Sequence, residues 1–120
     1  MSISNYGELA FLNTLRNTSF VVAQSYIKLH LGDPGEDGTL LPAANTLRKA
    51  VSFSAASAGS MAASATITWT SVPNTETYSH WSLWDAASAG NCLWTGALSS
   101  SASVTAGDTF QITSLTLTLD

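Results

Sequence analysis

Ser79-His80-Trp81-Ser82-Leu83-Trp84-Asp85 holds two of the chain's four tryptophans in a pattern of period two, which is typical of a strand with two different faces. The chain then runs through the small residues of 86–91 into a second apolar stretch, Cys92-Leu93-Trp94. Asp85 is expected to start a turn, and Gly90-Asn91 tolerates positive φ, so residues 79–94 are predicted to form a β-hairpin, the Trp hairpin. Aromatic side chains bury the largest area, so this hairpin is expected at the centre of the core.

The tryptophans of the hairpin also raise a question of exposure. Successive residues of a strand point to opposite faces, so either Trp81 or Trp84 must lie outside the main core. An exposed indole would be a candidate for a ligand or a subunit contact. Trp81, Trp84 and Trp94 could also form a platform on which sugars stack, although a core or interface role is favoured over the sugar platform.

The rest of the chain predicts a mainly β fold. Alternating or apolar strand patterns occur at 26–31, 49–53, 65–70 and 114–120, and a turn is expected at Ala106-Gly107-Asp108. Counting gives about seven or eight short strands, the number expected of an antiparallel β-sandwich or jelly roll. We expect one domain over 1–120, with the leucines of the terminal segment and the Trp hairpin in its core.

Two segments depart from the β pattern. Residues 3–17 predict the one helix, with Ser4 or Asn5 as its cap, Glu8 in its first turn and Arg16 in its last. The leucines at 9, 12 and 15 form an apolar stripe that needs a surface to dock on, either the chain's own sheet or a neighbouring subunit. Residues 32–47, rich in Gly, Pro and small side chains, predict a long loop of the kind that contacts a partner.

The charge of the chain excludes several classes of function. The chain has four basic and eight acidic residues, which gives a net charge of −4. A nucleic-acid groove and an anionic membrane surface both need clustered Lys and Arg, so neither partner is expected. Charged residues make up only 10% of the chain, against roughly a quarter in an average soluble domain. Such a surface suits a protein that is packed into an assembly.

The N-terminus and the single cysteine bear on where the protein folds. Residues 1–8 lack a basic region followed by an apolar one, and no apolar run approaches the roughly 18 residues that cross a bilayer, so folding in a cytoplasm is expected. The single Cys92 excludes an intrachain disulfide and is expected to be buried and unreactive.

The sequence gives little support for a catalytic site or a metal site. Residues 33–38 resemble the start of an EF-hand calcium loop, but Gly35 and Ala44 stand where ligands are needed, so a structural turn is favoured over a calcium site. His30 and His80 are expected to be hydrogen-bonded structural residues. Glu76 and Asp85 could be taken for a glycosidase pair, but scattered carboxylates produce such pairs in any fold. We therefore expect no catalytic residue, no cofactor and no metal ligand.

Several short motifs, in a fixed order, resemble a family of small structural proteins of tailed bacteriophages, described as tail-fibre or decoration proteins. These are Leu29-His30-Leu31-Gly32-Asp33-Pro34-Gly35, Arg48 before Val51-Ser52-Phe53, Ser79 to Ala86, Trp94-Thr95-Gly96-Ala97-Leu98 and Ala106-Gly107-Asp108. The resemblance covers most of the chain. It departs in the long loop, where Asn45-Thr46-Leu47-Arg48 replaces the family's usual Gly-x-Tyr-x-Arg.

The resemblance implies a virion component on the capsid surface: a decoration or cement protein, a homo-oligomer and commonly a trimer, that binds the major capsid protein and ties capsomers together after assembly in the host cytoplasm. A tail-fibre or baseplate module that recognises host glycans is the alternative, and a stand-alone carbohydrate-binding domain is a further one. The helix and the 32–47 loop are then assigned to shell or subunit contact. The expected interface residues are Tyr6, Leu9, Phe11, Leu12, Asp33, Glu36, Asp37, Leu40, Leu41 and Trp84. A polar cluster of His30, Asp33, Arg48, His80 and Asp85 is expected to brace the loop.

Overall fold

The computed structural model describes residues 2–119 and confirms the mainly β, antiparallel fold with one short helix. Nine strands lie within the described residues, against the seven or eight expected. The elements in chain order are β1 (Ser2–Ile3), α1 (Asn5–Thr14), β2 (Ser25–His30), β3 (Lys49–Val51), β4 (Ser60–Ala62), β5 (Ile67–Trp69), β6 (Glu76–Trp84), β7 (Cys92–Val104), β8 (Phe110–Ile112) and β9 (Thr116–Thr118).

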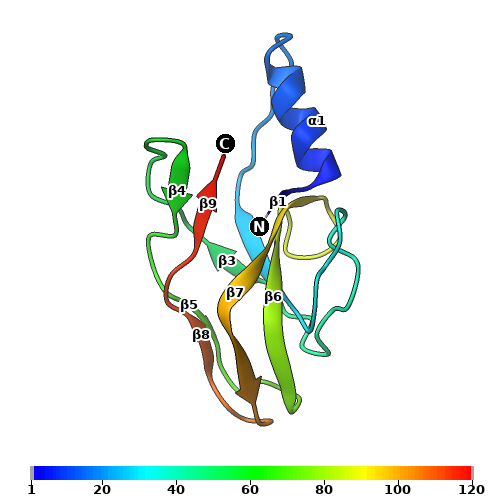
Figure 1. The fold of residues 1–120 in the computed structure, drawn as a ribbon, viewed down its shortest axis with the longest axis vertical. Coiled ribbons are helices and arrows are strands. Elements are labelled where there is room, and N and C mark those ends of the chain that lie inside the picture. The colour runs from blue at the N-terminus through cyan, green and yellow to red at the C-terminus, as the bar shows by residue number, and fades with distance from the viewer. Residues whose placement is uncertain (1, 120) are drawn as a thin grey trace.

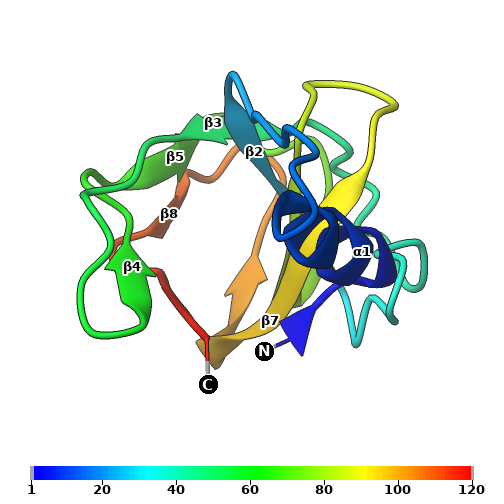
Figure 2. The same ribbon diagram turned by 90° about the horizontal axis from the view of Figure 1, so that it is seen from above.

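The strands form one large sheet and two small ones, an arrangement consistent with a β-sandwich. The large sheet has the order β1-β7-β6-β2-β3, and β4-β9 and β5-β8 are two-stranded sheets. Seen from above, the strands surround a common interior, with α1 over one side and β4 and β9 on the other (Figure 2). The molecule is elongated, 47 × 26 × 23 Å, and α1 lies at one end of its long axis (Figure 1).

The Trp hairpin is confirmed as β6 and β7, the long strands at the middle of the sheet. Trp81 and Leu83 join the main core. Gly96 lies opposite Trp81 across the hairpin, and a Cβ at Gly96 would collide with the indole. Glycine at this position therefore makes room for the indole of Trp81.

The small sheets close the other side of the core. Phe110 on β8 packs with Trp69 at 5.7 Å and with Tyr78 at 5.1 Å between ring centroids. Leu115 and Leu117 are buried, which confirms that the leucines of the terminal segment contribute to the core. The regular strand there is only three residues long and Leu119 is exposed, so the terminal segment is a shorter strand than its pattern predicts.

The helix is shorter than the predicted 3–17. Ile3 pairs with Trp94 in β1, which leaves Ser4 as the N-cap, accepting a hydrogen bond from the Gly7 amide at 3.0 Å. The helix ends at Thr14, so the expectation that Arg16 lies in its last turn is wrong. Among residues 2–119, no helix has the length and apolar character that crossing a bilayer requires.

Candidate interaction site

The 32–47 loop folds back along β2 and is held by the backbone. The Leu31 amide donates to the Leu41 carbonyl at 2.8 Å, and the Ala43 amide donates to the Leu29 carbonyl at 3.1 Å. Within the loop, the Leu40 amide donates to the Pro34 carbonyl at 2.9 Å. The predicted loop is therefore present, and backbone hydrogen bonds hold its second half along β2.

A carboxylate at the start of β6 clamps the end of the loop. Glu76 accepts hydrogen bonds from the Ala44 amide at 2.9 Å and the Asn45 amide at 3.0 Å. Sequence reasoning considered this residue only as half of a glycosidase pair with Asp85. The carboxylate of Asp85 instead accepts from the amide and the side chain of Asn91, within the turn of the Trp hairpin. Nothing in the sequence indicates the Glu76 clamp, because its donors lie about thirty residues away in an irregular segment.

His30, fully buried on β2, links the loop to the sheet. Its Nδ1 lies 2.8 Å from the Leu40 carbonyl oxygen, and its Nε2 lies 2.7 Å from Ser82 Oγ. A carbonyl can only accept, so Nδ1 carries the proton and Nε2 accepts from the Ser82 hydroxyl. Ser82 Oγ in turn accepts from Trp84 Nε1 at 2.7 Å. Burial lowers the pKa of His30, which agrees with a neutral, structural imidazole.

The indole of Trp84 is enclosed between the sheet, the loop and a cation. The Arg48 guanidinium carbon lies 4.1 Å from the centroid of the Trp84 ring. The same guanidinium donates to the Ala86 carbonyl at 2.8 Å and the Ala89 carbonyl at 2.7 Å. A Cβ at Gly38 would lie 3.2 Å from the ring, so the loop backbone approaches the indole closely at this glycine. Arg48 thus joins the turn of the Trp hairpin to the covered Trp84.

The three indoles of the hairpin are all covered. Trp81, Trp84 and Trp94 are 4%, 8% and 5% exposed. Trp84 does lie outside the main core, as the alternation predicts, but the expectation of an exposed indole is wrong, because the loop and Arg48 cover that face. A sugar platform built from these three rings is therefore absent. Trp84, which was predicted as an interface residue, is therefore buried within the chain itself.

Cys92 is buried beneath the same loop. Burial raises the pKa of its thiol to about 11, and its Sγ lies 3.5 Å from the Trp94 carbonyl oxygen. A thiol with so high a pKa is protonated at neutral pH and is a poor nucleophile. This agrees with the expectation of a buried, unreactive cysteine.

The expected polar cluster does not form as one group: His30, His80 and Asp33 lie at one end of the β2–β6 pair, and Arg48 and Asp85 lie at the other. Asp33 Oδ1 accepts from the Gly35 amide at 3.0 Å, and Nδ1 of His80 lies 2.8 Å from Ser79 Oγ. Arg48 and Asp33 are both described, and no ion pair joins them. The reason is topological: Arg48 is directed at the turn that follows β6, whereas the loop that begins after β2 carries Asp33 to the far end of that strand.

The acidic residues of the loop are placed near the start of the helix. The Asn5 amide donates to the Glu36 carbonyl at 3.3 Å, and Asn5 Nδ2 donates to Asp37 Oδ1 at 3.4 Å. No group of three His, Cys, Asp or Glu side chains within residues 2–119 is arranged to hold a metal ion. Leu40 and Leu41 are exposed beside these acids, so the predicted interface residues of the loop lie on the surface.

The helix presents its leucines to solvent. Leu9, Leu12 and Leu15 are 64%, 63% and 85% exposed, while Phe11 and Tyr6 pack on Phe20 at 5.8 and 6.3 Å between centroids. Of the two surfaces expected to cover the stripe, the chain's own sheet is excluded. Across the molecule eight of the fourteen leucines are exposed, all of them on the helix or at its C-cap Leu15, in or beside the 32–47 loop, or at Leu119.

Fold and surface together define a small, mainly β protein with a buried aromatic core and with exposed leucines at its helix and its 32–47 loop. The family model described as podophage GP4 fiber I protein gp80 matches residues 2–120, so the chain belongs to this family of phage structural proteins. Membership in a phage fibre family makes it a component of the virion. No curated protein matches the chain.

Proposed function

We propose that the chain is a fibre subunit of the virion that works by binding copies of itself and another virion protein, without catalysis. The observation that carries the proposal is the uncovered leucine stripe of α1. Fully burying one leucine stabilises a complex by roughly 1.5–3 kcal/mol, so three such side chains supply a substantial part of a stable contact. The family description supports a fibre rather than a head location.

The partners follow from the charge and the shape. A net charge of −4 with four basic residues disfavours nucleic acid and anionic membranes, so the stripe is assigned to protein. Its position at one end of an elongated molecule (Figure 1) suits attachment end-on, with the opposite end projecting. Self-association, as a trimer, is the proposed solution state.

Capsid decoration is the second candidate, because the same end-on stripe would fit a knob seated on a head shell. In that case the partner is the major capsid protein, and loss of the chain weakens the head. Electron microscopy of particles labelled with gold-conjugated antibody against the chain separates the two. Label on fibres supports the first proposal, label over the head supports the second, and absence of label from intact particles contradicts both.

The contact itself is tested by mutation of the stripe. Leu12→Gln/Leu15→Gln keeps good helix formers while removing apolar surface. The matched control is Glu8→Gln/Arg16→Gln, which alters two exposed side chains of the same segment without changing the net charge. We expect the leucine variant to lose self-association in light scattering, or incorporation into particles, while the control retains both. Equal assembly by the two variants would contradict the assignment of the stripe.

A further inference from the structure

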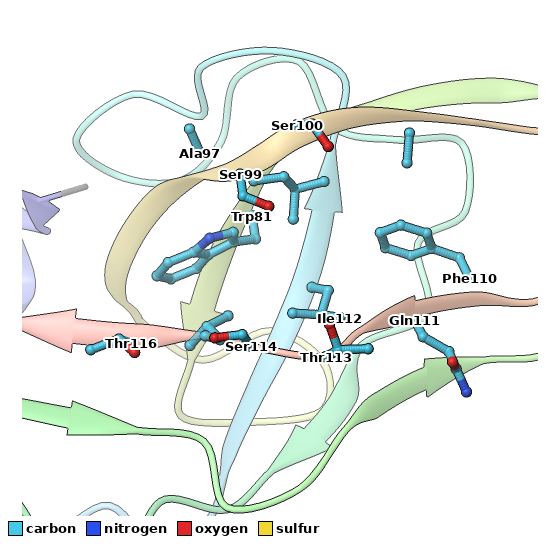
Figure 3. A pocket seen from close by; sticks show the side chains of 13 residues that line it. Trp81, Ala97, Ser99, Ser100, Phe110, Gln111, Ile112, Thr113, Ser114 and Thr116 are labelled. Atoms are coloured by element: carbon cyan, nitrogen blue, oxygen red, sulfur yellow. The ribbon is translucent and has the colours of Figure 1, made fainter.

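Two sheet edges without partner strands face each other across a gap between residues 97–102 of β7 and residues 110–116, which we call the seam. Within residues 2–119, the outer edge of β7 pairs with β1 only at Thr95 and Trp94. Beyond Thr95, that edge has no partner strand as far as Val104. Facing it are β8, which pairs only with β5, and β9, which pairs only with β4. Two strand edges that lack a partner strand therefore border the same opening (Figure 3).

The two edges do not pair with each other, and a cavity that is half open to solvent lies between them. Neither β8 nor β9 forms a ladder with β7, whereas paired strands lie about 4.8 Å apart. The cavity has a volume of about 440 Å³ and lies between residues 97–102 of β7 and residues 110–116. Two strand spacings, about 9.6 Å, are what one additional strand requires.

Neither edge carries a charged side chain or a proline that would block pairing. Natural sheets block free edges with charged side chains or proline, yet residues 96–104 contain neither, and the same holds for 109–119. The pairing of β7 with β6 is also irregular here, because Ala97 opposes His80 and Ala102 opposes Tyr78. Four residues of β7 thus face Ser79 alone, which leaves part of their backbone without a regular ladder.

The side chains around the seam indicate what it would accept. Its floor is apolar and buried, formed by Trp81, Phe110 and Ile112, while Ser99, Ser100 and Ser114 lie at its exposed rim (Figure 3). No charged side chain lines it. An occupant must therefore be uncharged, with apolar side chains toward the floor and small polar ones toward solvent, at the alternation of a β-strand.

We propose that the seam is the acceptor for an extended, uncharged segment of another virion protein, which adds as a strand between β7 and the β8–β9 edge. Main-chain hydrogen bonds on both sides would provide affinity, and the apolar floor would select alternate side chains. The inference rests on the proposed function, since the donor is a protein of the particle. It assigns a second contact, at the side of the molecule, distinct from the helix stripe at its end.

The experiment adds purified chain to phage particles that lack it and measures co-sedimentation and amide hydrogen exchange of the bound chain. We expect the amides of 98–102 and 113–116 to exchange rapidly in the free protein. Bound to particles, they should exchange at least about 100-fold more slowly, as hydrogen-bonded strand amides do. Unchanged exchange at both edges would overturn the proposal.

Variants give an independent test. Ser100→Lys places a charge in the seam, while Ser101→Lys places the same charge on the neighbouring exposed residue, which does not line the cavity. We expect Ser100→Lys to weaken particle binding at least about tenfold, because the lysine must be desolvated by the added strand, and Ser101→Lys to bind as wild type. Equal binding by the two variants would overturn the proposal.

The remaining outcomes separate the seam from the proposed function. Wild-type protein that fails to bind particles at all contradicts the virion role itself. Wild-type binding without protection at the seam contradicts the strand alone. Protection of the same amides by host lipopolysaccharide without particles would replace the strand by a glycan and overturn the proposal.

Discussion

Replacing Arg48 with methionine should destabilise the protein by about 2–3 kcal/mol. Methionine keeps an apolar stem against Trp84 but removes the cation that lies 4.1 Å from the ring centroid. A cation over a tryptophan contributes about 1 kcal/mol at a partly exposed site. The hydrogen bonds to the Ala86 and Ala89 carbonyls contribute about 1 kcal/mol each once solvent screening is allowed for.

Companion variants separate these contributions. Arg48→Lys keeps a charge near the ring but loses the planar fork, so it should recover about 1 kcal/mol relative to methionine. A double-mutant cycle of Arg48→Met with Trp84→Leu should give a coupling free energy of about 1 kcal/mol. Lys49→Met removes the same charge from the adjacent residue, for which no side-chain hydrogen bond or ring contact is found, and should cost less than about 0.5 kcal/mol.

Urea denaturation followed by tryptophan fluorescence measures the free energy of unfolding of each variant. In a thermal scan, each kcal/mol should lower Tm by about 4 °C for a domain of this size. An Arg48→Met variant as stable as Lys49→Met would refute the reasoning, since it would mean that the guanidinium contacts contribute no net free energy. A coupling free energy near zero would refute the cation–ring contact while leaving the hydrogen bonds intact.

Three further predictions concern the buried groups. Because burial lowers the pKa of His30, the unfolded chain binds more protons below about pH 6.5. The free energy of unfolding should therefore fall as pH drops from 7.5 to 5.5, with a smaller slope in His30→Asn; equal slopes would contradict this. Cys92, with a pKa of about 11, should react with iodoacetamide at pH 8 far more slowly than in urea, and comparable rates would show that the thiol is accessible. In Gly7→Ala, the new Cβ would lie 2.6 Å from the Leu93 carbonyl oxygen and 2.8 Å from Ile3 Cγ1, which should lower the free energy of unfolding by about 1–3 kcal/mol. The control Glu8→Ala, on the exposed side of the helix, should lower it by less than about 0.5 kcal/mol. Similar stability of the two variants would show that α1 is not docked at Gly7.

The strands and the helix cap were accessible from local pattern. The alternation around Trp81 and the turn at Gly90 belong to residues that touch one another or are close in the chain, so period and turn chemistry predicted the hairpin. Ser4 was recognisable as a cap for the same reason. The bounds of the helix were not. The two-residue pairing of β1 with β7 moves its start to Asn5, and it ends at Thr14, before the positive φ at Asn17, although the apolar pattern continues to Leu15.

For the candidate surfaces too, the sequence predicted local features and missed those that depend on distant segments. The leucine stripe of α1 and the long loop were predicted as contact elements, and both are exposed. The cover over Trp84 was not predicted, because it requires a loop thirty residues or more from the strand it covers. The polar cluster failed for the converse reason: residues that look complementary in a sequence were carried to different ends of the sheet by the register of β2 against β6.

The amino-acid sequence by itself determined the β class, the Trp hairpin, the apolar helix face and the low charge, since each is a property of composition or of neighbours a few residues apart. Only the tertiary structure decided that all three indoles are covered, that Glu76 and His30 hold the loop, and that two strand edges remain unpaired across a cavity. Those features depend on which distant backbone groups meet. Hydrogen bonding between them is set by topology and register, and no local pattern records it.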